Sequence, residues 1–267
     1  MLLPLFAEAG AERVANLTVP EILVLSIMAG GFITVGAVLA TLIATGKTNE
    51  GLKRLLEGVG FSVGFFTVLL SGALLFTEAN VELPATLLSR DGRTILSRLA
   101  RRWLLAGVGN LIGAVLVGWA ITTAQSFTPG VEALLAEIVA SKMRYQSIDG
   151  AAGWWQAVLS GVMGNWLVGM AAFLAVMGRT IVGKFIPVLL LVTAFVAAGF
   201  LHSPANMAFF SLAEPLSLGP GWAAALAWGI APAALGNVIG ALLLVALPLW
   251  FVDPRRSADR LDAATVE

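Results

Sequence analysis

The chain has 267 residues, of which 58% are hydrophobic and 12% are charged, with a formal net charge of zero, one histidine and no cysteine. Soluble domains carry about 25% charged residues, so this composition predicts a polytopic membrane protein with little mass outside the bilayer. Zero net charge disfavours nucleic acid as a partner, and the cysteine and histidine counts exclude disulfides, thiolate metal sites and multi-histidine metal sites. No cofactor is expected.

Six long apolar segments follow a short, mixed N-terminal stretch. Residues 1–20 are expected to be cytoplasmic, either as an interfacial amphipathic helix or as a frayed tail, and residues 253–267 form a predicted cytoplasmic tail. A spanning helix needs roughly 20 residues, so residues 21–252 are predicted to be an all-α membrane domain with six transmembrane helices. The segments run about Ile22–Thr45, Val59–Leu88, Trp103–Thr123, Trp154–Met177, Phe185–Leu218 and Trp222–Val252.

The second and fifth segments are longer than one straight span, and both carry small or polar residues near the middle. In the fifth, Gly199 loosens the backbone, Ser203 is suited to cap a new helix, and Pro204 fits that helix's first turn. In the second, Thr77 is placed to cap a second half-helix, with Glu78 in its first turn. Both segments are therefore predicted to break at the midplane, which is tolerated only inside protein or beside a cavity.

Basic residues predict the orientation of the chain. Eleven lysines and arginines lie on the side of the two termini, against five on the opposite side. By the positive-inside rule both termini are expected in the cytoplasm, in agreement with an even number of spans. The five residues predicted on the opposite side are Lys47, Lys53, Arg54, Lys142 and Arg144.

A motif recurs in the third and sixth segments. The sequence GNLIGA occupies residues 109–114 and GNVIGA occupies residues 236–241; Gly72 and Gly199 each lie 38 residues before the asparagine of one copy. Two three-helix units offset by an odd number of spans have inverted topology, and such repeats place substrate sites at their interface. The alternative is that these residues only mark close helix contacts. The recurrence of both motif and spacing favours the repeat.

His202 is the only histidine, and it falls at the predicted break of the fifth segment. An ionisable side chain at membrane depth is costly and marks a functional-site hypothesis. Thr77, the repeat partner of the His202 region, brings a hydroxyl to the same place, and two half-helix N-termini would add partial positive charge. This pattern indicates an anion site. Two readings stay open: His202 is either a ligand-contacting group or a structural buried ring, and Thr77 is either a ligand-contacting group or a plain helix cap.

Aromatic and basic residues near these donors are further pore candidates. Rings lining a pore form dry constrictions that exclude hydrated ions, although phenylalanines more often face lipid or neighbouring helices. Lys142, ahead of the fourth segment, either raises the local anion concentration or is a solvated loop lysine. The phenylalanines in question are Phe61, Phe65, Phe76 and Phe195.

Asparagines within the apolar segments form a separate group of candidates. Asn206 is either a pore-lining group or a tie between the break and its neighbours. Asn165 is also a pore candidate, but interhelical hydrogen bonding is the preferred interpretation for Asn165, Asn110 and Asn237. Enzyme chemistry is not expected, because the chain has no Walker A, nucleophile-elbow or HExxH motif.

These residues resemble the formate/nitrite transporter family of bacterial anion channels over nearly all of the chain. The departures from the family pattern are Leu201 and Leu74, where many members have acidic or polar residues, together with Glu78 and Pro204. The motifs that carry the resemblance are GALLFT at 72–77, GNLIG at 109–113, NWLV at 165–168, GFLHSPANM at 199–207 and GNVIG at 236–240.

The resemblance implies an aquaporin-like protomer with an inverted 3+3 repeat, assembled as a homopentamer in the bacterial inner membrane with a pore in each protomer. It makes His202 the central pore histidine and Thr77 the threonine beside it, and it places the four phenylalanines at or near the constrictions. Lys142 matches the lysine that the family carries ahead of the fourth span. The long interval from Lys142 to Asn165 implies an insertion.

Taken together, these features predict a channel or transporter for a small monovalent anion, with nitrite slightly preferred over formate. Hydrosulfide, lactate and acetate are alternatives within the same family. His202 is expected to donate a proton, so that a weak acid crosses as the neutral species. An aquaporin-type neutral-solute channel is one competitor, although paired Asn-Pro-Ala boxes are absent. A membrane anchor subunit of a redox complex is another, and a homo-oligomer that passes anions alone would exclude it.

Overall fold

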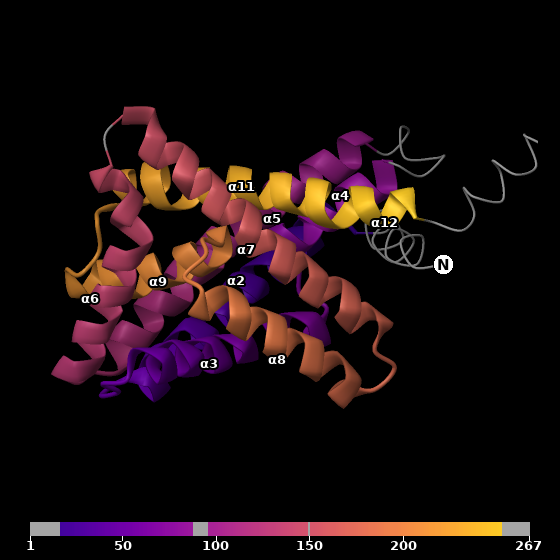
Figure 1. Cartoon of the computed structure of the whole chain (residues 1–267). Helices are drawn as coiled ribbons and strands as arrows, with labels where there is room; N and C mark the ends of the chain where they lie inside the picture. The colour runs from indigo at the N-terminus through magenta and orange to yellow at the C-terminus, as the bar shows by residue number, and fades with distance from the viewer. Residues whose placement is uncertain (1–16, 88–95, 149, 253–267) are drawn as a thin grey trace, which may run out of the picture.

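The computed structural model describes residues 17–87, 96–148 and 150–252, and all regular structure in these ranges is helical (Figure 1). By length and composition, five helical stretches suffice to cross a membrane: residues 19–44, 50–71, 100–124, 150–177 and 222–251. The predicted all-α membrane class is confirmed. The elements are α2 (Val19–Ala44), α3 (Glu50–Ser71), α4 (Phe76–Leu87), α5 (Leu96–Ala124), α6 (Pro129–Met143), η2 (Arg144–Ser147), α7 (Gly150–Met177), α8 (Ile181–Ala197), α9 (Ser203–Ala213), η3 (Glu214–Leu216), α10 (Trp222–Ala224), η4 (Ala225–Ile230), α11 (Ala231–Ala241), η5 (Leu242–Ala246) and α12 (Leu247–Phe251).

Both segments that were predicted to be interrupted are split. Helix α3 gives way to α4 over residues 72–75, and α8 gives way to α9 over residues 198–202. Gly72 and Gly199, the glycines that follow the first half-helices, both have a φ of 71°. Glycine adopts this left-handed conformation without the steric cost that a Cβ would impose. The first half-helix therefore ends in the same way at both breaks, at a glycine in the left-handed conformation.

The predicted capping residues are wrong by two positions in α4 and by one position in α9. Helix α9 begins at Ser203 with His202 in the N-cap position, and α4 begins at Phe76, so that Thr77 lies inside its first turn. Pro204 lies in the first turn of α9, as predicted. Neither Thr77 nor Ser203 supplies a cap, because side chains from other helices take that role.

The second spanning segment begins earlier than predicted. Helix α3 starts at Glu50, whereas the apolar segment was expected to start at about Val59. The sequence pattern failed here because charged residues in the first two turns lower the local hydropathy, although they are helical. These residues are Glu50, Lys53, Arg54 and Glu57, and all four line a cavity.

An unpredicted helix, α6, lies between α5 and α7 and carries Lys142 as its penultimate residue. The long interval between Lys142 and Asn165 consists of η2 and the first half of α7. Figure 1 shows α6 at the end of the molecule opposite to α4 and α12. Helix α6 packs on α9 and on η2. Lys142 is therefore carried by an ordered, packed helix, and the alternative that it is a solvated loop lysine is wrong.

Helix packing follows the same scheme in the two halves of the chain. Helix α2 packs against α3 and α5, and α7 packs against α8 and α11. Gly109 and Gly113 of α5 lie directly on α2, while Gly236 and Gly240 of α11 lie directly on α7. A Cβ on any of the four would overlap an atom of the facing helix. These glycines do mark close helix contacts, and they do so at matching positions.

Several predictions fall outside the described residues. The proposed N-terminal segment is described only from residue 17, and the proposed C-terminal tail, residues 253–267, is not described. Six of the basic residues used to predict the orientation also lie there, namely Arg13, Arg90, Arg93, Arg255, Arg256 and Arg260.

Candidate functional site

Two asparagines cap the second half-helices at the breaks. Asn110 Oδ1 accepts a hydrogen bond from the N–H of Phe76, the first residue of α4, at 2.8 Å. Asn237 Oδ1 accepts one from the N–H of Ser203, the first residue of α9, also at 2.8 Å. The first-turn N–H groups of a helix have no intrahelical partners. Each asparagine therefore stabilises a helix start that would otherwise be buried with an unpaired donor.

The same asparagines hold the extended residues inside the breaks. Asn110 Nδ2 donates to Leu74 O at 2.9 Å, and Asn237 Nδ2 donates to Leu201 O at 3.3 Å. The amide–carbonyl pairs are 36 residues apart in both halves, and the capping pairs are 34 residues apart in both halves. The predicted interhelical hydrogen bonding of Asn110 and Asn237 is confirmed, and it fixes the shape of both breaks.

His202 and Thr77 meet where the two breaks come together. His202 Nε2 lies 2.9 Å from Thr77 Oγ1, and the two residues are 1% and 0% exposed. Among the described residues, His202 Nδ1 has no hydrogen-bond partner. A buried polar atom without a partner costs about 1–3 kcal/mol. The free Nδ1 is thus a ring position at which a small ligand would gain a hydrogen bond.

Three phenylalanine rings pack beside this pair. The Phe61 ring is 5.9 Å from Phe195 in an edge-to-face arrangement, and 5.9 Å from Phe209 in a stacked one. The Phe195 ring lies 5.3 Å from the ring of His202. Helices α3, α8 and α9 thus contribute one apolar ring each to a cluster that separates His202 from the α6 end of the molecule. We call Phe61, Phe195 and Phe209 the phenylalanine cluster.

The other two predicted phenylalanines lie elsewhere. Phe76 stacks on Trp103 of α5 with ring centroids 5.1 Å apart, next to Thr77 in the chain. Phe65 is fully buried in the core, and within the described residues it makes no ring contact. Of the four predicted phenylalanines, the structure brings only Phe61 and Phe195 into ring contact with each other.

Asn206 and Lys142 form a second polar contact on the other side of the phenylalanine cluster. Lys142 Nζ donates to Asn206 Oδ1 at 2.9 Å and lies 4.9 Å from the centre of the Phe209 ring. Asn206 Nδ2 donates to Gly229 O in the π-helical segment η4 at 2.7 Å. Asn206 therefore ties α9 to its neighbours and also fixes the position of the lysine.

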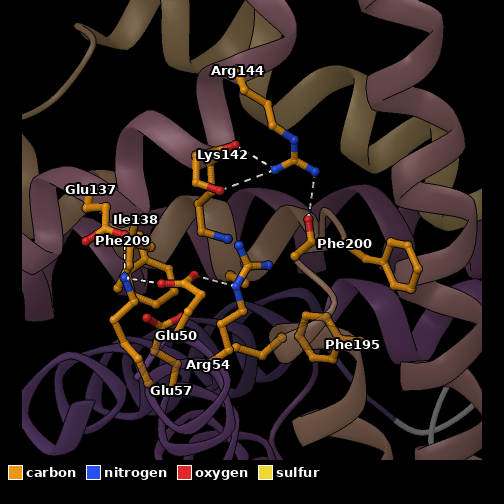
Figure 2. Close-up of a pocket in the computed structure, with 15 residues that line it drawn as sticks. Glu50, Arg54, Glu57, Glu137, Ile138, Lys142, Arg144, Phe195, Phe200 and Phe209 are labelled. Atoms are coloured by element: carbon orange, nitrogen blue, oxygen red, sulfur yellow. Dashed lines mark hydrogen bonds and ion pairs between the residues drawn. The ribbon is translucent and has the colours of Figure 1, made fainter. Parts of the chain in front are cut away.

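A cavity of about 80 Å³ opens beside Lys142 and ends on the phenylalanine cluster (Figure 2). We call it the α3–α6 cavity, and its floor includes Phe195 and Phe209. Lys142 is partly exposed as a whole residue, but desolvation and the nearby Arg144 guanidinium lower the pKa of Lys142 to about 7, against a smaller opposing effect of Glu57. Its charge is therefore present below neutral pH and lost above it.

Asn165 contacts the backbone of Thr77, the partner of His202. Its Nδ2 donates to Asn237 O at 2.8 Å and to Thr77 O at 3.4 Å, which bears out the predicted interhelical bonding. Its Oδ1 has no partner among the described residues. Glu78, the next residue after Thr77, is buried. Asn165 thus stabilises the position of Thr77 relative to α11.

The sequence analysis missed Phe209 and the charged first turns of α3. Phe209 follows His202 and Asn206 at intervals of seven and three residues, the spacing of one helix face. Glu57 precedes Phe61 by four residues, which places the two on one face of α3. Helical spacing from the known candidates was the signal that could have found both. The described residues hold no group of three or more histidine, aspartate or glutamate side chains placed for a metal ion.

Comparison with known proteins gives consistent matches over nearly the whole chain. The family model described as formate/nitrite transporter matches residues 5–251. A probable formate transporter of Methanothermobacter thermautotrophicus is 32% identical over 258 residues, which covers 90% of this chain and 92% of the relative. The formate channel FocA of Escherichia coli is 28% identical over 251 residues, or 85% of each chain.

Solved structures share the fold. An FNT family ion channel matches with a TM-score of 0.79 at 22% identity, covering 95% of this chain and 99% of its own. A pentameric formate channel with formate bound matches with a TM-score of 0.74 at 23% identity, covering 88% and 97%. At these identities the two structures establish the helical architecture alone.

Proposed function

Because the chain belongs to the formate/nitrite transporter family, we propose that it is a membrane channel for a small monovalent anion, formate or nitrite. The observation that carries this proposal is the 2.9 Å contact between His202 Nε2 and Thr77 Oγ1 at two adjoining helix breaks. The relatives compared above are named as formate transporter or formate channel, which makes formate the first anion to test. The slight preference for nitrite stays a prediction, and hydrosulfide, lactate and acetate stay alternatives.

We infer six spans, counting α3 with α4 as the second and α8 with α9 as the fifth, related as an inverted 3+3 repeat. The support is the equal residue separations at the two breaks and the matching packing of the two halves. With both termini cytoplasmic by the positive-inside rule, the α3–α6 cavity faces outward. One structural neighbour is named as pentameric, and we propose a homopentamer in the bacterial cytoplasmic membrane here.

In the proposed mechanism, the anion enters the α3–α6 cavity near Lys142 and meets the phenylalanine cluster. A bare charge is costly among apolar rings, so transfer of a proton from the His202 ring to an oxygen of the anion favours passage of the neutral acid. The acid returns the proton to water on the far side, and His202 regains a proton from the cavity. Thr77 holds the ring through Nε2 and leaves Nδ1 for the substrate.

A flux panel tests the proposal. Purified protein in liposomes is expected to pass formate and nitrite, and to pass them faster at pH 6 than at pH 7.5, once leakage through protein-free liposomes is subtracted. Hydrosulfide and lactate in the same panel decide between anions of the family. Water or glycerol flux without anion flux would support the neutral-solute channel, and a homogeneous protein that passes none of these solutes would support an anchor subunit.

Replacing Lys142 by glutamine is expected to lower formate uptake at pH 6 about threefold to tenfold, because a fixed charge at a channel mouth raises the local anion concentration. The pKa of Lys142 of about 7 means that wild type loses this attraction as the outside pH rises from 6 to 8. Lys142→Arg keeps its positive charge throughout, so formate uptake by this variant should decline less between pH 6 and pH 8 than uptake by wild type. Initial uptake rates in liposomes measure both effects.

Lys47→Gln is the matched control, since Lys47 is exposed, lies on the same side and is absent from the cavity wall. Equal uptake by Lys142→Gln and Lys47→Gln at pH 6 would contradict the role of Lys142.

A further inference from the structure

The α3–α6 cavity holds carboxylates, which is unexpected for the access path of an anion. Glu50 accepts hydrogen bonds from Arg54 at 2.6 Å and from Lys53 at 2.9 Å, and Glu137 accepts one from Lys53 at 2.5 Å (Figure 2). Two positive and two negative charges thus form one network across α3 and α6. These four groups compensate each other and leave no net charge in the cavity.

Three charged groups of the cavity wall remain outside that network. Lys142 donates to the neutral amide of Asn206, and Arg144 donates to neutral oxygens of Ser141, Tyr145 and Gly199. Glu57 makes no hydrogen bond or ion pair with any described residue, although it faces Lys53, Glu137, Lys142 and Glu50. With Lys142 protonated, these three groups sum to one positive charge.

Glu57 lies close to the phenylalanine cluster of the proposed pore. Glu57 is half-buried on α3, one turn before Phe61, so its carboxylate lies on the helix face that carries the phenylalanine cluster. Since the described residues offer it no bonding partner, no hydrogen bond of the fold depends on its charge. A half-buried charge that stabilises nothing visible calls for a functional explanation.

Building on the proposed channel function, we propose that Glu57 is a specificity-determining residue that limits the α3–α6 cavity to one uncompensated positive charge. A cavity with one excess positive charge is neutralised by one monovalent anion. A dianion such as sulfate would leave the cavity with one excess negative charge in a partly desolvated place, which Coulomb repulsion disfavours. The same carboxylate weakens the hold of Lys142 and Arg144 on a monovalent anion, so that it moves on toward His202.

Glu57→Gln tests this inference in planar bilayers at pH 6, where Lys142 is charged, with formate currents measured at increasing sulfate concentration on both faces. We expect half-saturation at about tenfold lower formate concentration, a reduced saturating current, and block by about tenfold less sulfate than wild type needs. Glu57→Asp keeps the charge and should keep the wild-type resistance to sulfate. Glu132→Gln, the same charge change on α6 outside the cavity wall, is the matched control.

The two proposals fail in different ways. If wild type carries formate current but Glu57→Gln matches Glu132→Gln in half-saturation and sulfate block, the inference about Glu57 is overturned and the channel function stands. If Glu57→Gln does not yield a stable oligomer, Glu57→Asp tests the charge argument by itself. Block of Glu57→Asp by about tenfold less sulfate than wild type needs would overturn that argument. If wild type carries no current of formate or nitrite, both proposals fail.

Discussion

Replacing His202 by asparagine is expected to abolish proton-coupled uptake of formate and to lower its rate by about tenfold or more. An imidazole ring can bind and release a proton, whereas an amide carries no exchangeable charge at any physiological pH. Asparagine keeps a neutral polar side chain in the break, so the substitution removes the titratable ring without placing an apolar group there. A tenfold rate loss corresponds to about 1.4 kcal/mol of barrier, which is small beside the cost of a bare charge among apolar rings.

Two quantities are measured for this prediction in the same liposomes: internal formate, and internal pH reported by a trapped dye. Wild type should show acidification that accompanies uptake, and His202→Asn should show the slower uptake without that acidification. Thr41→Val is the control, because its hydroxyl is buried and bonded only within its own helix, to Ala37 O. If His202→Asn keeps wild-type uptake and its pH dependence, His202 does not transfer the proton.

The pairing of His202 with Thr77 could be predicted from the sequence because two independent signals agreed. A single histidine at membrane depth marked one partner, and the repeat of the glycine–asparagine motif pointed to the other. Segment length, together with the small and polar residues near the middle of each segment, predicted that both spans would be interrupted. The sequence did not show which residues cap the second half-helices. Asn110 and Asn237 lie on other helices, 34 residues away in the chain from the N–H groups that they cap.

The α3–α6 cavity was missed for a different reason. Hydropathy is averaged over a window of residues. The charges of Lys53, Arg54 and Glu57 lowered that average over the first turns of α3, so these turns were not predicted to belong to the spanning helix. Contacts between rings depend on how each helix is rotated about its axis, and this rotation decides that Phe209 joins Phe61 while Phe76 packs on Trp103. Composition carries no information about that rotation.

Replacing Asn237 by alanine is expected to destabilise the protein by about 3–5 kcal/mol and to abolish anion flux. Asn237 Oδ1 accepts from both the N–H and the hydroxyl of Ser203, and Nδ2 donates to Gly161 O and Leu201 O. Each buried group left without a partner costs about 1–3 kcal/mol. Since His202 immediately precedes Ser203, loss of this cap also moves the imidazole away from Thr77.

Thermal unfolding in detergent, followed by circular dichroism, measures the loss of stability. Asn49→Ala is the control, because Asn49 caps α3 at an exposed end through a single bond from Leu52 N–H, which is worth about 1 kcal/mol. Asn110→Ala should resemble Asn237→Ala, because it breaks the corresponding bonds in the other half. A loss for Asn237→Ala no larger than for Asn49→Ala would mean that the breaks hold their shape without these amides. A large loss for only one of the two asparagines would mean that the halves, despite equal spacing, do not support the pore equally.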